Sequence, residues 1–146
     1  MKRLTIIGLL VLFFNTSYAN DCNISISGSD MMQFDKNTLE VSFSCSEVML
    51  TLKHSGNLTK DMMGHNVVIV ATENFEAVIG TINMEAGIEN GYLPDSPEVL
   101  VKTAMVGGGE TTQITFDLSK FKEDGDYTFF CSFPGHYAIM KGKFVI

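Results

Sequence analysis

The sequence predicts an all-β domain, built as an antiparallel β-sandwich or barrel with Greek-key connections. Three observations support this fold class. The chain contains many short runs rich in β-branched and aromatic residues. Several runs alternate between apolar and polar residues, and clusters of Gly, Ser, Asn and Asp separate them. The sequence has no internal repeat and no low-complexity tract, so a single domain accounts for it.

The runs that we expect to be strands are residues 23–27, 32–35, 39–43, 48–54, 67–71, 99–105, 112–117, 126–130 and 141–146. Alternation is clearest in residues 48–53 (VMLTLK) and 114–118 (ITFDL), as expected for a sheet with one face on the core and one in water. Turn residues between the runs lie at positions 27–30, 55–57, 107–109 and 123–126.

Residues 72–89 are less typical of a strand. Four apolar residues recur there at helical spacing: Phe75, Val78, Ile79 and Ile82. Gly80 interrupts this pattern, so we expect either one short helix or an irregular flap in the segment.

The first 19 residues predict a secretory signal peptide. Lys2 and Arg3 give it a positive start, residues 6–14 form an apolar stretch too short to span a bilayer, and Ser17-Tyr18-Ala19 fits a cleavage site. We expect an exported mature domain of residues 20–146 with no membrane segment. Its net charge is −9 instead of −7, because Lys2 and Arg3 are lost. So acidic a chain excludes nucleic acid as a partner and favours a basic or neutral protein.

The mature chain has three cysteines, at positions 22, 45 and 131. Export permits disulfides, and the odd number predicts one disulfide and one remaining thiol. Cys22 and Cys45 are the natural pair, because both lie outside a C-terminal cluster of possible metal ligands. Cys131 would then be held as a thiolate by a metal ion, or it would be a buried, unreactive cysteine.

The C-terminal cluster combines three metal-binding groups in one loop between two expected strands. Cys131 offers a thiolate, His136 an imidazole and Met140 a thioether, and His65 supplies a second imidazole from far upstream. Two His and one Cys with a weak axial Met are the ligands of a type 1 blue-copper site, which transfers single electrons. The sequence therefore predicts one copper ion in a site that only the folded chain can assemble.

Other kinds of site fit these residues less well. A copper oxidase needs an open coordination position or a second metal centre, and the chain has only three His. A structural zinc site prefers four strong ligands, and Met is a poor one. A copper chaperone or storage protein would favour accessible Met- or Cys-rich ligands. We therefore expect an electron carrier and not an enzyme, with a periplasmic copper-binding, chaperone or storage protein as the alternative.

Together these motifs resemble the azurins, a family of bacterial periplasmic cupredoxins. The resemblance rests on Gly64-His65-Asn66, on residues 131–142 (CSFPGHYAIMKG) and on Cys22 and Cys45, and it extends through the mature chain. It implies a cupredoxin-type sandwich, a periplasmic location, a monomer and a Cys22–Cys45 disulfide. The copper ligands that it implies are His65, Cys131 and His136 in a plane, with Met140 and the Gly64 carbonyl as axial ligands.

The resemblance also implies roles around the ligands. Asn66 would tie the two ligand loops together, and Phe133 would support them. An apolar docking patch for redox proteins such as c-type cytochromes or copper reductases would consist of Met32, Met63, Met84, Pro134 and Ala138. The alternative for Met32 and Met84 is an ordinary role in the core.

The sequence departs from the azurin pattern at one place. The best-known azurins carry a buried Trp just after the Gly-His-Asn motif, whereas this chain has Val67 and Val68 there and no Trp at all. The resemblance further implies that His54 lies near the site, and we expect its role to be structural.

Overall fold

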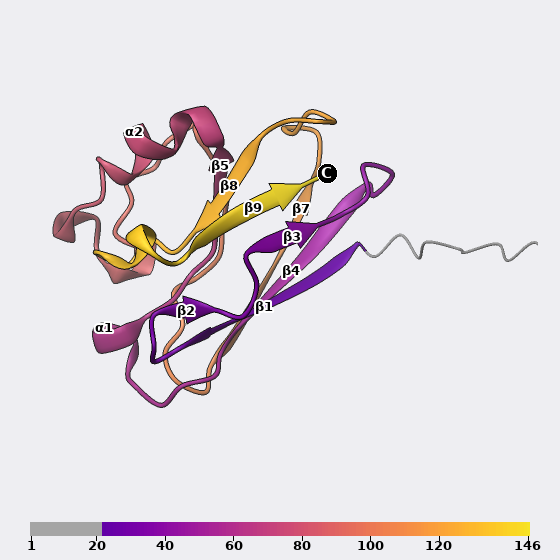
Figure 1. The fold of residues 1–146 in the computed structure, drawn as a ribbon. Helices are drawn as coiled ribbons and strands as arrows, with labels where there is room; N and C mark the ends of the chain where they lie inside the picture. Colours follow the sequence, from indigo (N-terminus) through magenta and orange to yellow (C-terminus); the bar gives the residue numbers. More distant parts are fainter. Residues whose placement is uncertain (1–21) are drawn as a thin grey trace, which may run out of the picture.

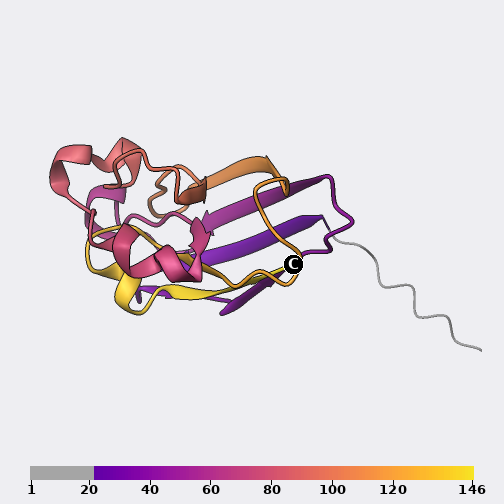
Figure 2. The same cartoon turned by 90° about the horizontal axis from the view of Figure 1, so that it is seen from above.

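The computed structural model describes residues 22–146 and forms two stacked β-sheets (Figures 1 and 2). The predicted signal peptide, residues 1–19, lies outside the described residues. The four-stranded sheet has the order β2 (Gln33–Phe34), β1 (Asn23–Ser29), β4 (Glu47–His54) and β7 (Thr111–Asp117). The five-stranded sheet has the order β3 (Thr38–Glu40), β9 (Lys141–Val145), β8 (Tyr127–Phe130), β5 (Val68–Ala71) and β6 (Val99–Lys102).

The predicted alternation places the core between these sheets. In β4, Val48, Leu50 and Leu52 are fully buried, while Met49 and Lys53 on the other face are exposed. Residues of the five-stranded sheet, such as Ile69, Phe129 and Phe144, meet them from the opposite side. The predicted β-sandwich is therefore confirmed.

The predicted helix or flap covers the outer face of the five-stranded sheet. The segment contains α2 (Phe75–Ile79) and three 3-10 turns, η1 (Thr72–Asn74), η2 (Met84–Ala86) and η3 (Ile88–Asn90). Phe75 and Val78 of α2 pack with Val68, Val70 and Phe130, which belong to β5 and β8. This covering explains why β5 is buried on both faces. Below, the word flap refers only to residues 80–92, the part of the chain that follows α2.

The prediction of antiparallel pairing throughout was wrong at two ladders. β1 pairs with β4 in parallel, and β3 pairs with β9 in parallel. After β2 the chain crosses to the other sheet as β3 and returns as β4, so β4 runs in the same direction as β1. Alternation of side chains carries no information on strand direction.

Two expected strands end three residues earlier than predicted. β3 ends at Glu40 because the chain turns at residues 42–45, where the backbone N–H of Cys45 donates to the Ser42 carbonyl. β6 ends at Lys102, and beyond it the side chain of Thr103 accepts the N–H of Val67 at 2.9 Å. A four-residue helix, α1 (Lys60–Met63), was not predicted.

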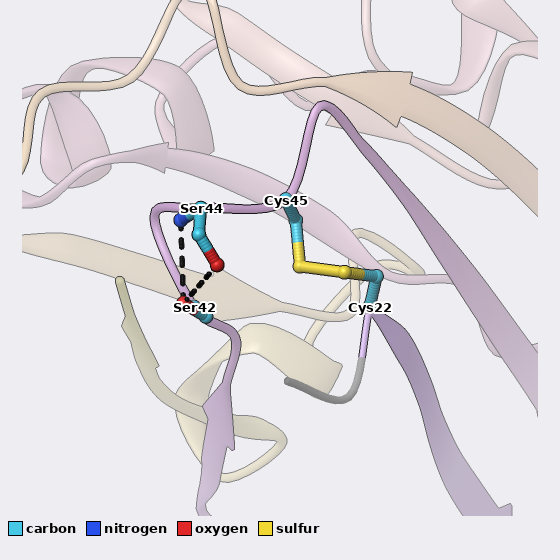
Figure 3. Close-up of a disulfide and its surroundings, with 4 residues drawn as sticks. All are labelled: Cys22, Ser42, Ser44 and Cys45. Carbon is cyan, nitrogen blue, oxygen red and sulfur yellow. Dashed lines mark hydrogen bonds between the residues drawn. A yellow bond between two sulfur atoms is a disulfide. The ribbon is translucent and has the colours of Figure 1, made fainter. Parts of the chain in front are cut away.

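Cys22 and Cys45 form a disulfide, as predicted (Figure 3). Cys22 precedes β1 and Cys45 precedes β4, so the bond joins the starts of two parallel strands. β1 has seven residues and spans roughly 23 Å. The disulfide therefore lies at one end of the sandwich, and the loop after β1 lies at the other (Figure 1). Within residues 22–146, no helix is long and apolar enough to cross a bilayer.

Candidate metal centre

Two segments bring the predicted ligands to the same end of the sandwich. Cys131 follows β8, His136 begins the 3-10 turn η4 (His136–Ala138), and Met140 precedes β9. His65 comes from the other segment, directly after α1 and Gly64, where two backbone hydrogen bonds with Val106 hold it. All of these side chains belong to short connections whose ends are fixed by strands.

The three strongest candidate ligands converge in a buried position. The Cys131 sulfur lies 3.7 Å from Nδ1 of His136 and 3.9 Å from Nδ1 of His65. Among residues 22–146 these three form the only cluster of at least three His, Cys, Asp or Glu side chains with ligand atoms all within 4.8 Å. A cation bonded to sulfur at about 2.3 Å and to nitrogen at about 2.0 Å, at trigonal angles, would separate those atoms by about 3.7 Å. The residues therefore fit a single metal ion.

The two weaker candidates lie beside this cluster. The Gly64 carbonyl oxygen is 3.8 Å from the Cys131 sulfur. Met140 is fully buried, and its backbone carbonyl accepts the N–H of Cys131 at 3.0 Å. Met140 thus sits next to Cys131 in space although nine positions separate the two in sequence.

A hydrogen bond fixes the tautomer of His65. Its Nε2 lies 2.9 Å from the Ser29 carbonyl, which can only accept, so Nε2 carries the proton. Nδ1, which faces Cys131, is therefore left with its lone pair free for a metal ion. Gly28 allows this approach, because a Cβ there would lie 2.5 Å from Cδ2 of His65.

Burial determines the protonation of the site in the metal-free protein. It raises the pKa of the Cys131 thiol to about 12, although the backbone N–H groups of Asn66 and Phe133 donate to the sulfur and oppose this rise. Burial also lowers the pKa of His65, and it lowers that of His136 to about 4 with help from the neighbouring imidazoles. Near neutral pH the site therefore holds a thiol and two neutral imidazoles, and a cation would displace only the thiol proton.

Asn66 connects the two ligand segments. Its Oδ1 accepts the backbone N–H of Ser132 at 2.8 Å, and its Nδ2 donates to the Ser132 hydroxyl at 2.8 Å. That hydroxyl donates in turn to the Gly91 carbonyl at 2.6 Å. Sequence reasoning found Asn66 but missed Ser132 and Gly91. The role of Gly91 could not be predicted, because every residue has a backbone carbonyl. The role of Ser132 could not be predicted either, because a serine between Cys and Phe does not by itself indicate a hydrogen-bond partner.

Phe133 lies against the His136 ring, with the ring centres 4.4 Å apart. On its other side, Tyr92 of the flap meets Phe133 edge to face at 5.5 Å. Phe133 thus links the loop of residues 131–140, called the metal loop below, to the flap by packing.

His54 stacks on His65, with ring centres 4.4 Å apart and planes 14° from parallel. It is fully buried, its Nδ1 accepts the N–H of Gly56, and its Nε2 donates to the Met63 carbonyl. Both nitrogens are engaged within the protein, so His54 packs and orients its neighbours and has no nitrogen left for a metal ion.

The predicted docking residues come from segments that gather at this end of the molecule in both views (Figures 1 and 2). Met84 is 70% exposed and Ala138 is exposed, which excludes the core role for Met84. Met32, Met63 and Pro134 are half-buried. The same segments carry three further exposed apolar residues that the sequence reasoning missed: Met31, Met62 and Ile139.

Comparison with known proteins connects this geometry to a family. The family described as "Copper binding proteins, plastocyanin/azurin family" matches residues 20–146. The chain is 49% identical to the azurin of Alcaligenes faecalis over 122 residues, which cover 83% of this chain and 94% of that one. It is 40% identical to an azurin of Pseudomonas aeruginosa over 147 residues, which cover 100% of this chain and 99% of that one. The azurin of Bordetella pertussis is 45% identical over 135 residues, covering 92% of this chain and 89% of that one.

Proposed function

This chain belongs to the plastocyanin/azurin family of copper-binding proteins, and we propose that it is a periplasmic carrier of single electrons between redox proteins. The observation that carries the proposal is the convergence of the Cys131 sulfur and the Nδ1 atoms of His65 and His136 in a buried site.

Each ligand would have a distinct role. Cys131, His65 and His136 would bind one copper ion as equatorial ligands, and Met140 and the Gly64 carbonyl would approach it as weak axial ligands. The copper ion would supply one-electron chemistry by alternating between Cu(I) and Cu(II). Soft sulfur from Cys131 and Met140 suits the reduced state, and the two imidazoles suit both states.

The protein around the ligands would keep them still during electron transfer. His65 is held by the Ser29 carbonyl and by stacking on His54, and Asn66 ties its segment to Ser132 in the metal loop. Ligands that need not move when the charge changes keep the reorganisation energy small, which is what fast electron exchange requires. Burial excludes water and prevents loss of the ion.

Electrons would enter and leave through the edge of His136. His136 is 3% exposed and lies in the loop that carries Pro134 and Ala138. The docking patch, Met32, Met63, Met84, Pro134 and Ala138, would make the small apolar contact that suits short-lived complexes. We infer that the partners are redox proteins, such as c-type cytochromes or copper reductases.

The alternative, a copper chaperone or storage protein, is less well supported. Such a protein must exchange its metal readily, whereas Cys131, His65 and Met140 are each fully buried here. Electron exchange with a reduced c-type cytochrome, followed by stopped-flow absorbance, separates the two functions. A carrier oxidises the cytochrome many times faster than it loses copper to a chelator, and the opposite order would favour a chaperone.

Addition of Cu(II) to the purified mature protein tests the site itself. We expect an intense blue absorption from the thiolate-to-copper charge transfer and a narrow copper hyperfine splitting in the EPR spectrum. The Cys131→Ser variant should lose the blue band, and a band that persisted would place the sulfur ligand elsewhere. Determination of the N-terminus of the exported protein tests the location, because removal of the signal peptide should leave Asn20 first.

A further inference from the structure

Gly91 lies where the flap meets the metal loop. It follows η3 in a left-handed conformation, with φ 63° and ψ 28°. Its carbonyl accepts the hydrogen bond from the Ser132 hydroxyl, which in turn accepts from Asn66. A chain of hydrogen bonds therefore runs from the Asn66 side chain through the Ser132 hydroxyl to the carbonyl of Gly91.

The bare α-carbon of Gly91 faces the same pair of side chains. A Cβ at this position would lie 2.6 Å from Nδ2 of Asn66 and 3.0 Å from Oγ of Ser132. Both side chains are fully buried and hydrogen-bonded, so neither can yield without breaking the network. The left-handed backbone conformation favours glycine here, and the contact with Asn66 and Ser132 is what any larger residue would disturb.

This network leads to the copper-binding sulfur. The backbone N–H groups of Asn66 and Phe133 donate to the Cys131 sulfur. The Asn66 side chain is bonded to the N–H of Ser132, the residue between Cys131 and Phe133. A shift of the Asn66–Ser132 pair would therefore move both N–H groups that point at the sulfur.

We propose that Gly91 is a positioning residue for the copper site, which holds Asn66 and Ser132 so that two backbone N–H groups remain directed at the Cys131 sulfur. The proposal rests on the proposed function, because its consequence is on the copper–thiolate bond. Hydrogen bonds to a thiolate withdraw electron density from it and disfavour Cu(II), which raises the reduction potential. The flap would thus tune the site without touching the metal.

The test compares Gly91→Ala with a matched control, Gly87→Ala. Gly87 lies in the same flap with a positive φ of 74°, but a Cβ there would have no atom within 4 Å. Both variants introduce alanine at a positive φ. Gly87 is the more demanding position, because its ψ of 162° lies in a region that essentially only glycine adopts, but only Gly91→Ala presses on the network. We expect Gly91→Ala to lower the reduction potential and to lower copper affinity about tenfold or more, and Gly87→Ala to change neither.

The copper-free protein provides an independent readout. In ¹H–¹⁵N NMR spectra, the side-chain amide of Asn66 and the backbone N–H of Phe133 should shift in Gly91→Ala and stay in place in Gly87→Ala. If the two variants agree in potential and in these resonances, the proposal is wrong. A wild-type protein that binds Cu(II) without blue colour would instead overturn the proposed function, so the two failures are distinguishable.

A second variant tests the same route if Gly91→Ala does not fold. Ser132→Ala removes the hydroxyl that connects Gly91 to Asn66. The reduction potential should fall in Ser132→Ala as well, because Asn66 then loses the hydroxyl that connects it to the Gly91 carbonyl. An unchanged potential in Ser132→Ala would contradict the proposal.

Discussion

Copper affinity should depend on pH through one proton, that of Cys131. The pKa of this thiol is raised to about 12, while the pKa values of His65 and His136 are lowered from the ordinary value of 6.5. Between pH 6.5 and 8 the metal-free site therefore holds one proton that copper must displace. Mass action then predicts an affinity that rises about tenfold, or about 1.4 kcal/mol, for each pH unit.

Competition with a chromophoric Cu(I) chelator of known pH dependence measures this slope. Calorimetry in buffers of different ionisation enthalpy counts the released proton directly. The Met140→Leu variant is a matched control, because it changes a ligand without changing the number of protons, and it should keep the slope. Cys131→Ser should abolish the slope. A wild-type slope of zero would show that the thiol is already ionised in the metal-free protein and that burial does not raise its pKa.

Three further predictions concern stability and potential. Replacing Cys22 and Cys45 together by alanine should lower the free energy of unfolding by about 3.4 kcal/mol, since the bond closes a loop with a sequence separation of 23. Chemical denaturation measures this loss. The blue spectrum should not change, because the disulfide lies at the far end of the sandwich from the metal site. The metal-free protein should lose stability as pH falls from about 6.5 to about 4, by up to about 3 kcal/mol for His136. The reason is that the His136 imidazole has the lower pKa in the folded protein, so the unfolded chain protonates it first. A His136→Ala variant with the same pH dependence of stability would contradict this assignment. Met140→Leu should keep the blue colour and raise the reduction potential measured by voltammetry, because a carbon atom offers no electron pair to Cu(II), and a lowered potential would argue against the axial role.

The sequence was most informative where a pattern of residue types has a single physical explanation, as for alternating apolar residues and for metal-binding side chains. The alternation in residues 48–53 identified the buried face of β4 correctly. The spacing of Cys131, His136 and Met140 between two strands indicated a ligand loop, because thiolate, imidazole and thioether together are the ligands of a type 1 copper site. The structure brings this loop and His65 together, as expected.

The remaining features depend on contacts between segments distant in sequence. Nothing in residues 23–29 indicates that β1 pairs with β4 in parallel, since the side-chain pattern is the same for either direction. The helix α1 has four residues, too few for a periodic pattern. The roles of Ser29 and Gly91 were hidden for another reason, because both act through backbone carbonyls, which every residue possesses.

The position of β9 in its sheet has a consequence for how the protein folds. This final strand lies between β3 and β8, so it joins residues near the beginning of the described chain to residues near its end. Contacts over such a separation form slowly, since a long loop must close before they provide any stabilisation. The metal loop itself is closed locally, by the pairing of β8 with β9 at Phe130 and Lys141, but His65 joins it only once β5 has paired with β8. Copper binding by all three ligands should therefore report on the pairing of segments far apart in sequence, and a chain shortened before Lys141 would expose the edges of both β3 and β8 to aggregation.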